Sequence, residues 1–160
     1  AFTTGQAVIQ GLELQASTVL SFGDMNAPID LAYTYTDAQI SRDNPEEGFI
    51  DGDTLAAVPE NTLSLRLGLE TAMNWDNYAV IKYIDETCVT IGCNNDSNPV
   101  NRTEDLLVTD LISRYALNDD AVVFFKFENV FDERSIVSRQ PEGARPNKPR
   151  TASIGLQYQF

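Results

Sequence analysis

The chain has 160 residues, and its 24 acidic against 11 basic residues give a net charge of -13. Such an acidic composition disfavours nucleic-acid binding, because contacts to phosphate require lysine and arginine. The absence of histidine excludes histidine metal ligands and histidine general bases. The longest apolar run, Ala121–Phe125, is far shorter than the roughly 20 residues of a transmembrane helix. Membrane-spanning β-strands stay compatible with the composition, because their alternating residues give a weak hydropathy signal.

The first two predicted elements are β-strands. Apolar and polar residues alternate over Ala7–Ala16 and again over Ile29–Ser41. A period of two residues is typical of a strand whose two faces meet different surroundings. Residues 17–28 are expected to form a connection of intermediate length, and residues 42–58 form a long loop rich in Asp, Glu, Gly and Pro.

The clearest alternation occupies Thr62–Ala72. Four leucines fall on one face of this strand, whereas helical spacing would scatter them around the axis. They are Leu63, Leu65, Leu67 and Leu69. A short turn at residues 72–76 leads into the next strand, Trp75–Asp85, in which Val80 and Ile84 blur the alternation.

The long connection at residues 86–105 contains the two cysteines, Cys88 and Cys93. No further cysteine and no histidine is present to complete a zinc site. The Asn- and Gly-rich turn around both cysteines favours a disulfide in an oxidising compartment over two free thiols. Asn94–Asn98 fits an Asx turn better than a calcium loop, because the Gly and Glu spacing of an EF-hand is missing.

Three more strands complete the chain. Alternation predicts them over Leu106–Leu117, Ala121–Val130 and Arg150–Phe160. The first two are joined by a short turn, and residues 131–149 form a long connection with three prolines. The sequence therefore predicts an all-β fold, an antiparallel meander of about seven long strands.

Strand length, loop length and aromatic placement favour a membrane barrel over a soluble sandwich. The strands average ten or eleven residues, whereas strands of globular proteins have about 5–6 and membrane-spanning ones about 9–11. Long connections on one side and short ones on the other are typical of outer-membrane barrels. Aromatic residues lie mostly near strand ends on the apolar face, as at membrane interfaces. They are Tyr33, Tyr35, Trp75, Tyr83, Tyr115, Tyr158 and Phe160.

Charged residues on the opposite face should line the barrel lumen and pair across strands or contact a plug. They are Arg66, Glu70, Lys82, Asp110, Arg114, Lys126 and Glu128.

The basic residues of the chain concentrate in its last connection. The segment from Arg134 to Arg150 has a net charge of +4, so the other 143 residues carry -17. Its basic members are Arg134, Arg139, Arg145, Lys148 and Arg150. Arginine offers a rigid, permanently charged fork to carboxylates, so we expect these side chains to bind an anionic ligand. The alternative is that they pair with acids of the lumen and loops or with lipopolysaccharide phosphates.

Several motifs resemble one family. Phe127–Arg134 resembles the N-(L/V)-F-D turn that enters the last extracellular loop of TonB-dependent outer-membrane receptors. Gly143–Arg150 resembles the G-x-R-P-G-K-P-R run before their last strand, with asparagine in place of the second glycine. Gly11–Leu14 and Val58–Asn61 resemble shorter patterns of the same barrels. Within the family, the last loop looks most like that of receptors for ferric citrate and related ferric siderophores.

The resemblance implies that residues 1–160 are the C-terminal part of a plugged transmembrane β-barrel, without the plug domain and the TonB box. Plugged barrels have 22 strands, so about seven strands leave two open edges. The three long connections would be extracellular. Tyr158 and Phe160 would belong to the terminal signal read by the barrel assembly machinery.

The implied function is import of a ferric chelate or another small nutrient across the outer membrane of a Gram-negative bacterium, energised through TonB. The implied partners are the nutrient, the TonB complex, the barrel assembly machinery and outer-membrane lipid, with no nucleic acid. We expect no enzymatic activity and no cofactor, and we expect the isolated chain to self-associate through its edges. Two alternatives are a secreted β-rich binding or adhesion domain and a non-TonB outer-membrane channel. A second layer packed on the leucine face would favour the secreted domain.

Overall fold

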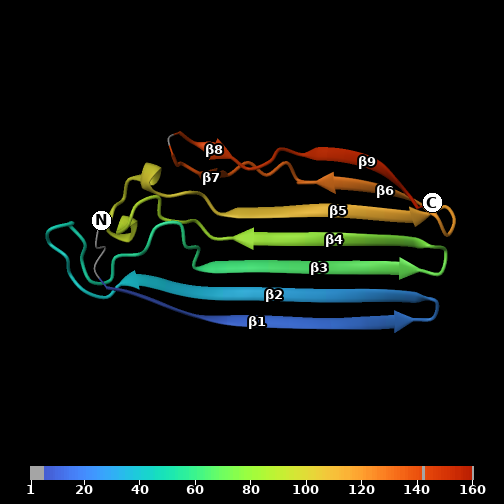
Figure 1. Ribbon diagram of the computed structural model, residues 1–160, viewed down its shortest axis with the longest axis horizontal. Coiled ribbons are helices and arrows are strands. Elements are labelled where there is room, and N and C mark those ends of the chain that lie inside the picture. The colour runs from blue at the N-terminus through green and yellow to red at the C-terminus, as the bar shows by residue number, and fades with distance from the viewer. Residues whose placement is uncertain (1–5, 142, 160) are drawn as a thin grey trace.

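The computed structural model describes residues 6–141 and 143–159. Seven long strands form one antiparallel sheet in the order β1-β2-β3-β4-β5-β6-β9 (Figure 1). Their bounds are β1 Ala7–Phe22, β2 Met25–Ile40, β3 Asn61–Thr71, β4 Trp75–Ile84, β5 Leu106–Ala116, β6 Ala121–Glu128 and β9 Thr151–Tyr158. The predicted all-β antiparallel meander is therefore confirmed.

The long connections contain short elements that the sequence did not predict. A small two-stranded sheet joins β7 (Ile136–Ser138) to β8 (Arg145–Pro146). Two single 3₁₀ turns, η1 (Cys93–Asn95) and η2 (Pro99–Asn101), follow β4. Within the described residues, no helix is long and apolar enough to cross a membrane.

The first hairpin is longer than predicted, and the expected intermediate connection at residues 17–28 is wrong. β1 and β2 pair without a break up to Phe22 and Met25, and only two residues form the turn. Gly23 takes a φ of 62° in this turn, a left-handed conformation that glycine adopts without a steric penalty. The strand pairing therefore continues up to the turn on both strands.

Pro28 lies in the part of this hairpin that was predicted as a connection. Proline cannot donate to a strand ladder, so it argues against a central strand. The pairing of β2 with β3 omits Ala27 and Pro28, which accommodates the missing N–H. Gly68 on β3 leaves room for the proline ring, because a Cβ there would lie 2.5 Å from Pro28 Cγ.

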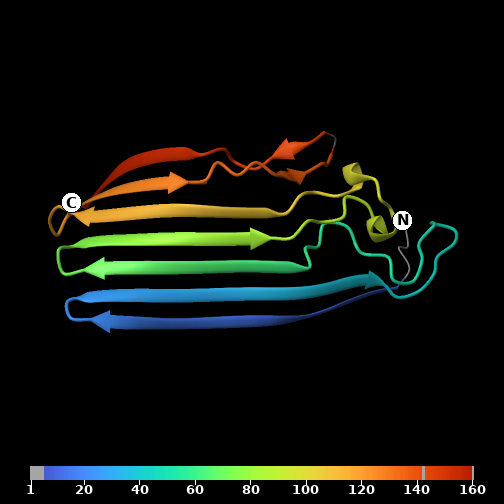
Figure 2. The ribbon, with the colours of Figure 1, turned by 180° about the vertical axis from the view of Figure 1, so that it is seen from behind.

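The sheet is a single layer with one apolar and one polar face. Tyr33, Leu63, Tyr83 and Leu107 form one row across four strands on the apolar face. Figures 1 and 2 show the two sides of this layer, and neither carries a second sheet or a helix over the long strands. The buried apolar residues of the described chain are Ala38, Ile40, Cys88, Cys93 and Ala121. The leucine face thus packs under nothing that the structure describes, which removes the support for a secreted sandwich-like domain.

The predicted lumen-facing charges share the polar face. Arg66 Nη1 lies 3.2 Å from Asp30 Oδ2, and its guanidinium carbon lies 4.3 Å from the centre of the Tyr78 ring. Lys82 Nζ lies 4.0 Å from Asp110 Oδ2 on the neighbouring strand. Cross-strand pairing therefore neutralises part of this face.

All long connections lie at one end of the sheet, and the short turns and the end of β9 lie at the other (Figure 1). We name the long connections the acidic loop (residues 41–60), the disulfide loop (residues 85–105) and the basic loop (residues 129–150). β1 and β9 form the two edges, so the sheet is open. Aromatic residues mark both ends of the apolar face, with Trp75 paired to Tyr115 near the short turns.

Candidate functional site

The candidate site is the basic loop, and its two ends are held together by asparagines. Asn129 is 3% exposed, and its Nδ2 donates to the carbonyls of Glu133 and Lys148, at 2.9 Å each. Its Oδ1 accepts from the Glu133 amide at 2.9 Å. Asn147 Oδ1 accepts from the backbone N–H of Ser135 at 3.0 Å, and the backbone N–H of Asn147 donates to the Ser135 carbonyl at 3.0 Å. The loop therefore has a closed, hydrogen-bonded base.

The N-V-F-D motif forms this base because of its backbone. Asn129 and Asp132 take φ values of 51° and 55°, in the left-handed region that Asn and Asp tolerate better than most residues. The Asp132 amide donates to the Asn129 carbonyl at 2.9 Å, which closes the turn. The motif thus directs the chain from β6 back towards β9.

Acids at the foot of the loop pair with two of the five predicted ligand-binding residues. Lys148 Nζ donates to Glu128 Oε2 at 2.6 Å, and Arg134 Nη2 donates to Asp132 Oδ2 at 3.0 Å. The Arg134 side chain is still 77% exposed. Lys148 and Arg134 therefore pair with acids of the loop, as the alternative to ligand binding proposed, although most of the Arg134 side chain stays exposed.

The other three predicted residues keep their charge available. Across residues 6–141 and 143–159, no carboxylate lies in ion-pair range of Arg139, Arg145 or Arg150. Arg145 and Arg150 are exposed, and Arg139 is partly buried.

The Asp132 carboxylate is stabilised in its charged form. The hydrogen bond from Arg134, followed by that from the Arg150 amide, holds the pKa of Asp132 below its ordinary value. Asp132 therefore stays ionised at neutral pH. Its carboxylate accepts from the Arg134 side chain at the start of the basic loop and from the Arg150 backbone N–H at its end.

A disulfide joins Cys88 to Cys93 in the disulfide loop, and Cys93 is only 2% exposed. The asparagines that follow are exposed, and their side chains bond to the acidic loop. Asn94 donates to the Gly52 carbonyl at 3.1 Å, and Asn95 donates to the buried carboxylate of Asp53 at 2.8 Å. The expected Asx turn is present in this segment, because the Asn98 amide donates to Asp96 Oδ1 at 2.9 Å, and a second follows in which the Val100 amide donates to Asn98 Oδ1 at 3.2 Å.

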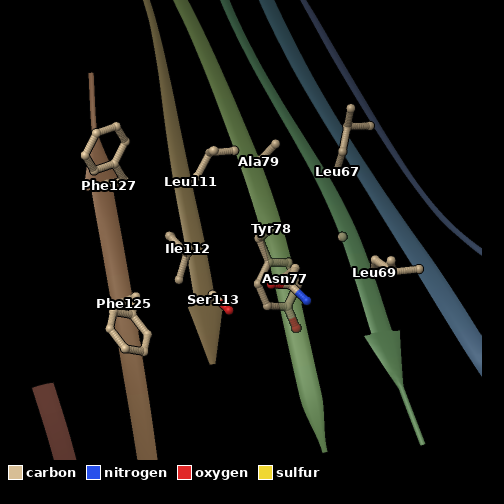
Figure 3. Close-up of a pocket in the computed structure, with 11 residues that line it drawn as sticks. Leu67, Leu69, Asn77, Tyr78, Ala79, Leu111, Ile112, Ser113, Phe125 and Phe127 are labelled. Atoms are coloured by element: carbon tan, nitrogen blue, oxygen red, sulfur yellow. The ribbon is translucent and has the colours of Figure 1, made fainter. Parts of the chain in front are cut away.

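A hollow of about 480 Å³ lies away from the loops, on the apolar face (Figure 3). Its rim and floor come mainly from residues of that face on β3 to β6. They include Leu67, Leu69, Asn77, Ala79, Leu111, Ser113, Phe125 and Phe127. Trp75 Nε1 donates to Ser113 Oγ at 2.8 Å beside it. Its mainly apolar lining is unsuited to binding an anion.

The predicted assembly signal is only partly within the described chain. Tyr158 is exposed and pairs with Ala121 at the end of β9. Phe160 lies outside the described residues.

Sequence reasoning missed the roles of Asn129, Asn147 and Asp53. Asn129 stood inside the recognised motif, so its position after an apolar strand was a usable signal for a capping side chain. Asn147 looked like a departure from a glycine pattern, yet its amide completes the loop base. Asp53 carries no local signal, because its partner Asn95 lies 42 residues away.

Comparison with known proteins identifies relatives of this arrangement. A model of the TonB-dependent receptor-like β-barrel family matches residues 1–130. The metal-pseudopaline receptor CntO of Pseudomonas aeruginosa is 30% identical to this chain over an alignment of 168 residues. The alignment covers 99% of this chain and 22% of CntO. The chain therefore spans about a fifth of the length of the curated relatives that it matches.

Solved structures share the fold at lower identity. The siderophore receptor PiuA of Acinetobacter baumannii superposes with a TM-score of 0.75 at 17% identity, covering 98% of this chain and 22% of PiuA. The ferric-catecholate import receptor Fiu of E. coli gives a TM-score of 0.75 at 19% identity, covering 98% of this chain and 21% of Fiu. These matches confirm the barrel-type fold.

Proposed function

Because the chain belongs to the TonB-dependent receptor-like β-barrel family, we propose that it is the C-terminal barrel part of an outer-membrane receptor that imports a metal chelate. The family consists of receptors rather than enzymes, and its barrels are outer-membrane proteins of Gram-negative bacteria. The named relatives support a chelate as cargo, since they are receptors for metal-pseudopaline and for siderophores. The energy would come from TonB through a plug outside these 160 residues.

The observation that carries the choice of ligand is the charge of the basic loop. An acidic chain places five cations in one connection, and the structure puts that connection at the end of the sheet where the other long loops lie (Figure 1). Three of the five have no carboxylate in ion-pair range within the described chain. An anionic chelate, such as ferric citrate or a ferric siderophore with free carboxylates, suits arginine forks of this kind.

Uptake by the full-length receptor tests the proposal. Cells that express wild type or a variant with all five cations changed to glutamine would receive radiolabelled ferric citrate, a ferric siderophore and metal-pseudopaline. We expect uptake of the accepted chelate by wild type, loss of most of it in the variant, and loss of all of it without TonB.

A matched control separates binding from assembly. The lumen-facing Arg66→Gln variant removes a charge from the same barrel away from the loops, and surface labelling measures how much of each receptor reaches the outer membrane. Unchanged uptake by the neutralised loop at equal surface level would contradict the ligand role of Arg134, Arg139, Arg145, Lys148 and Arg150.

Two further partners belong to the proposal. The end of the chain around Tyr158 and Phe160 would be read by the barrel assembly machinery, and the apolar face would contact outer-membrane lipid.

The isolated chain should self-associate, because both edge strands and the leucine face would otherwise meet water. Size-exclusion chromatography with light scattering tests this, and a monodisperse monomer in water would contradict it.

A further inference from the structure

We propose that Arg102 is a positioning residue for the candidate ligand site: it ties the disulfide loop to the basic loop and thereby fixes the guanidinium of Arg139. The inference rests on the proposed function, because it takes Arg139 as a ligand-binding group. It goes further by assigning the arrangement of that group to a residue in a different loop.

The side chain of Arg102 is fixed on both sides of the disulfide. Its Nη1 pairs with Glu86, and its Nη2 donates to the Cys93 carbonyl at 2.9 Å. Its backbone forms a β-bridge with Cys88. A guanidinium that uses two separate nitrogens for two partners has little freedom to rotate.

The carbonyl of Arg102 then reaches into the basic loop. Arg139 Nε donates to it at 2.7 Å, across 37 residues of sequence. This bond uses Nε, the guanidinium nitrogen nearest the aliphatic part of the side chain. The two terminal nitrogens, Nη1 and Nη2, therefore stay available to bind two oxygens of a ligand. The orientation of the Arg139 fork is therefore set by the position of the Arg102 backbone.

Neighbouring contacts strengthen the same tie. Gln140 Nε2 donates to the Val89 carbonyl at 2.8 Å. The Ile136 amide donates to Glu104 Oε2 at 2.7 Å, and the Glu104 amide donates to the Ile136 carbonyl at 2.9 Å. The first arm of the basic loop is thus bonded to the disulfide loop along residues 136–140.

The disulfide loop is in turn bonded to the acidic loop. The Ala57 amide donates to the Cys88 carbonyl at 2.9 Å, and the Gly92 amide donates to the Thr54 carbonyl at 2.9 Å. The three long loops therefore form one connected unit around the disulfide. An arginine that is immobilised before binding loses less side-chain entropy when the ligand arrives, which raises affinity.

The test compares Arg102→Gln with Arg42→Gln in the full-length receptor. Arg42 is an exposed arginine of the acidic loop, so both variants remove one positive charge from the same end of the barrel. Hydrogen exchange measures the order of residues 136–140 without any ligand, and equilibrium titration measures affinity for the chelate that the uptake assay identifies. We expect Arg102→Gln to speed exchange about tenfold and to weaken binding about tenfold, and Arg42→Gln to change neither.

A second variant approaches the tie from its other side. Arg139→Met removes the donor and should speed exchange of residues 136–140 as much as Arg102→Gln does. The double variant should be no faster than either single one, because the Arg102 side chain acts on these residues only by placing the carbonyl that accepts from Arg139. If the two substitutions had additive effects on the exchange of residues 136–140, the proposed link between Arg102 and Arg139 would be wrong.

The two readouts separate the two proposals. Unchanged exchange in Arg102→Gln overturns the positioning role of Arg102, whatever the affinity does. Faster exchange with unchanged affinity for the chelate leaves the tie intact and overturns the ligand role of Arg139 instead.

Discussion

Replacing Asn129 with alanine should open the basic loop while leaving the sheet in place. The substitution removes three side-chain hydrogen bonds to Glu133 and Lys148 from a site that is 3% exposed. It also places alanine at a φ of 51°, where a Cβ is unfavourable. Both effects act on the base of the loop, and neither touches a ladder bond of the long strands.

The size of the effect follows from these contacts. Each hydrogen bond contributes about 1 kcal/mol net, and the left-handed backbone costs alanine about 1 kcal/mol more than asparagine. The base of the loop should therefore lose about 4 kcal/mol relative to its open form, which is nearly a thousandfold in the opening equilibrium. The net figure per hydrogen bond already includes rebonding to water, so we expect amides of residues 133–147 that exchange through this opening to do so several hundred-fold faster.

Hydrogen exchange with mass spectrometry on the full-length receptor measures this directly. Asn129→Gly is the matched variant, since glycine loses the same bonds but adopts the left-handed backbone freely. It should exchange about fivefold more slowly than Asn129→Ala, the difference that about 1 kcal/mol makes. Less than a threefold change in Asn129→Ala would refute the view that this side chain holds the loop closed.

Three further outcomes follow from other contacts. Gly68→Ala should lower the unfolding temperature of the barrel by crowding the ring of Pro28, at a cost of about 1–3 kcal/mol, measured by heat-modifiable electrophoresis. The pKa of Asp132 is lower in the folded loop than in the open one, so its stabilising effect is present above the ordinary carboxyl pKa and is lost as pH falls through the folded value. Asp132→Asn should therefore loosen the loop at neutral pH and differ little from wild type once the pH lies below the pKa of Asp132 in the folded loop, as measured by the mobility of a spin label in the loop. Serine in place of both Cys88 and Cys93 should cost about 2 kcal/mol and speed exchange in the disulfide loop.

Controls for these outcomes lie in the same elements. Ser64→Ala sits on the polar face of β3, as Gly68 does, and should leave the unfolding temperature within about a degree of wild type. Asp43→Asn removes an acid from the acidic loop and should not alter label mobility in the basic loop at any pH. Equal thermal loss in Ser64→Ala and Gly68→Ala would show that crowding against Pro28 is irrelevant.

The strands could be predicted from sequence because each has two faces with different surroundings. Leu63, Leu65, Leu67 and Leu69 occupy one face of β3, and polar residues and glycine occupy the other, so a period of two is visible without any partner strand. The part of the first hairpin next to its turn was predicted as a connection, and there the fit of Pro28 into β2 depends on Gly68, 40 residues later, which makes room for the proline ring.

The arrangement of the loops could be predicted only in outline. The concentration of cations in the basic loop is a property of composition, and it was visible at once. The contact of Arg139 with Arg102 spans 37 residues and uses a backbone carbonyl, which every residue possesses, so no side-chain pattern marks it. Contacts of this kind depend on where the strands bring the loop ends, and that is tertiary information.

The order of pairing in the sheet constrains how the barrel is assembled. Each long strand pairs with the next long strand along the chain, and β6 pairs with β9 across the basic loop. Local pairings form quickly, whereas a pairing across a long connection must first meet the entropic cost of closing it. Closure of that connection by Asn129 and Asn147 therefore lowers the kinetic barrier to adding the terminal strand. Mutations that relax this loop should reduce the yield of inserted receptor before they alter ligand affinity.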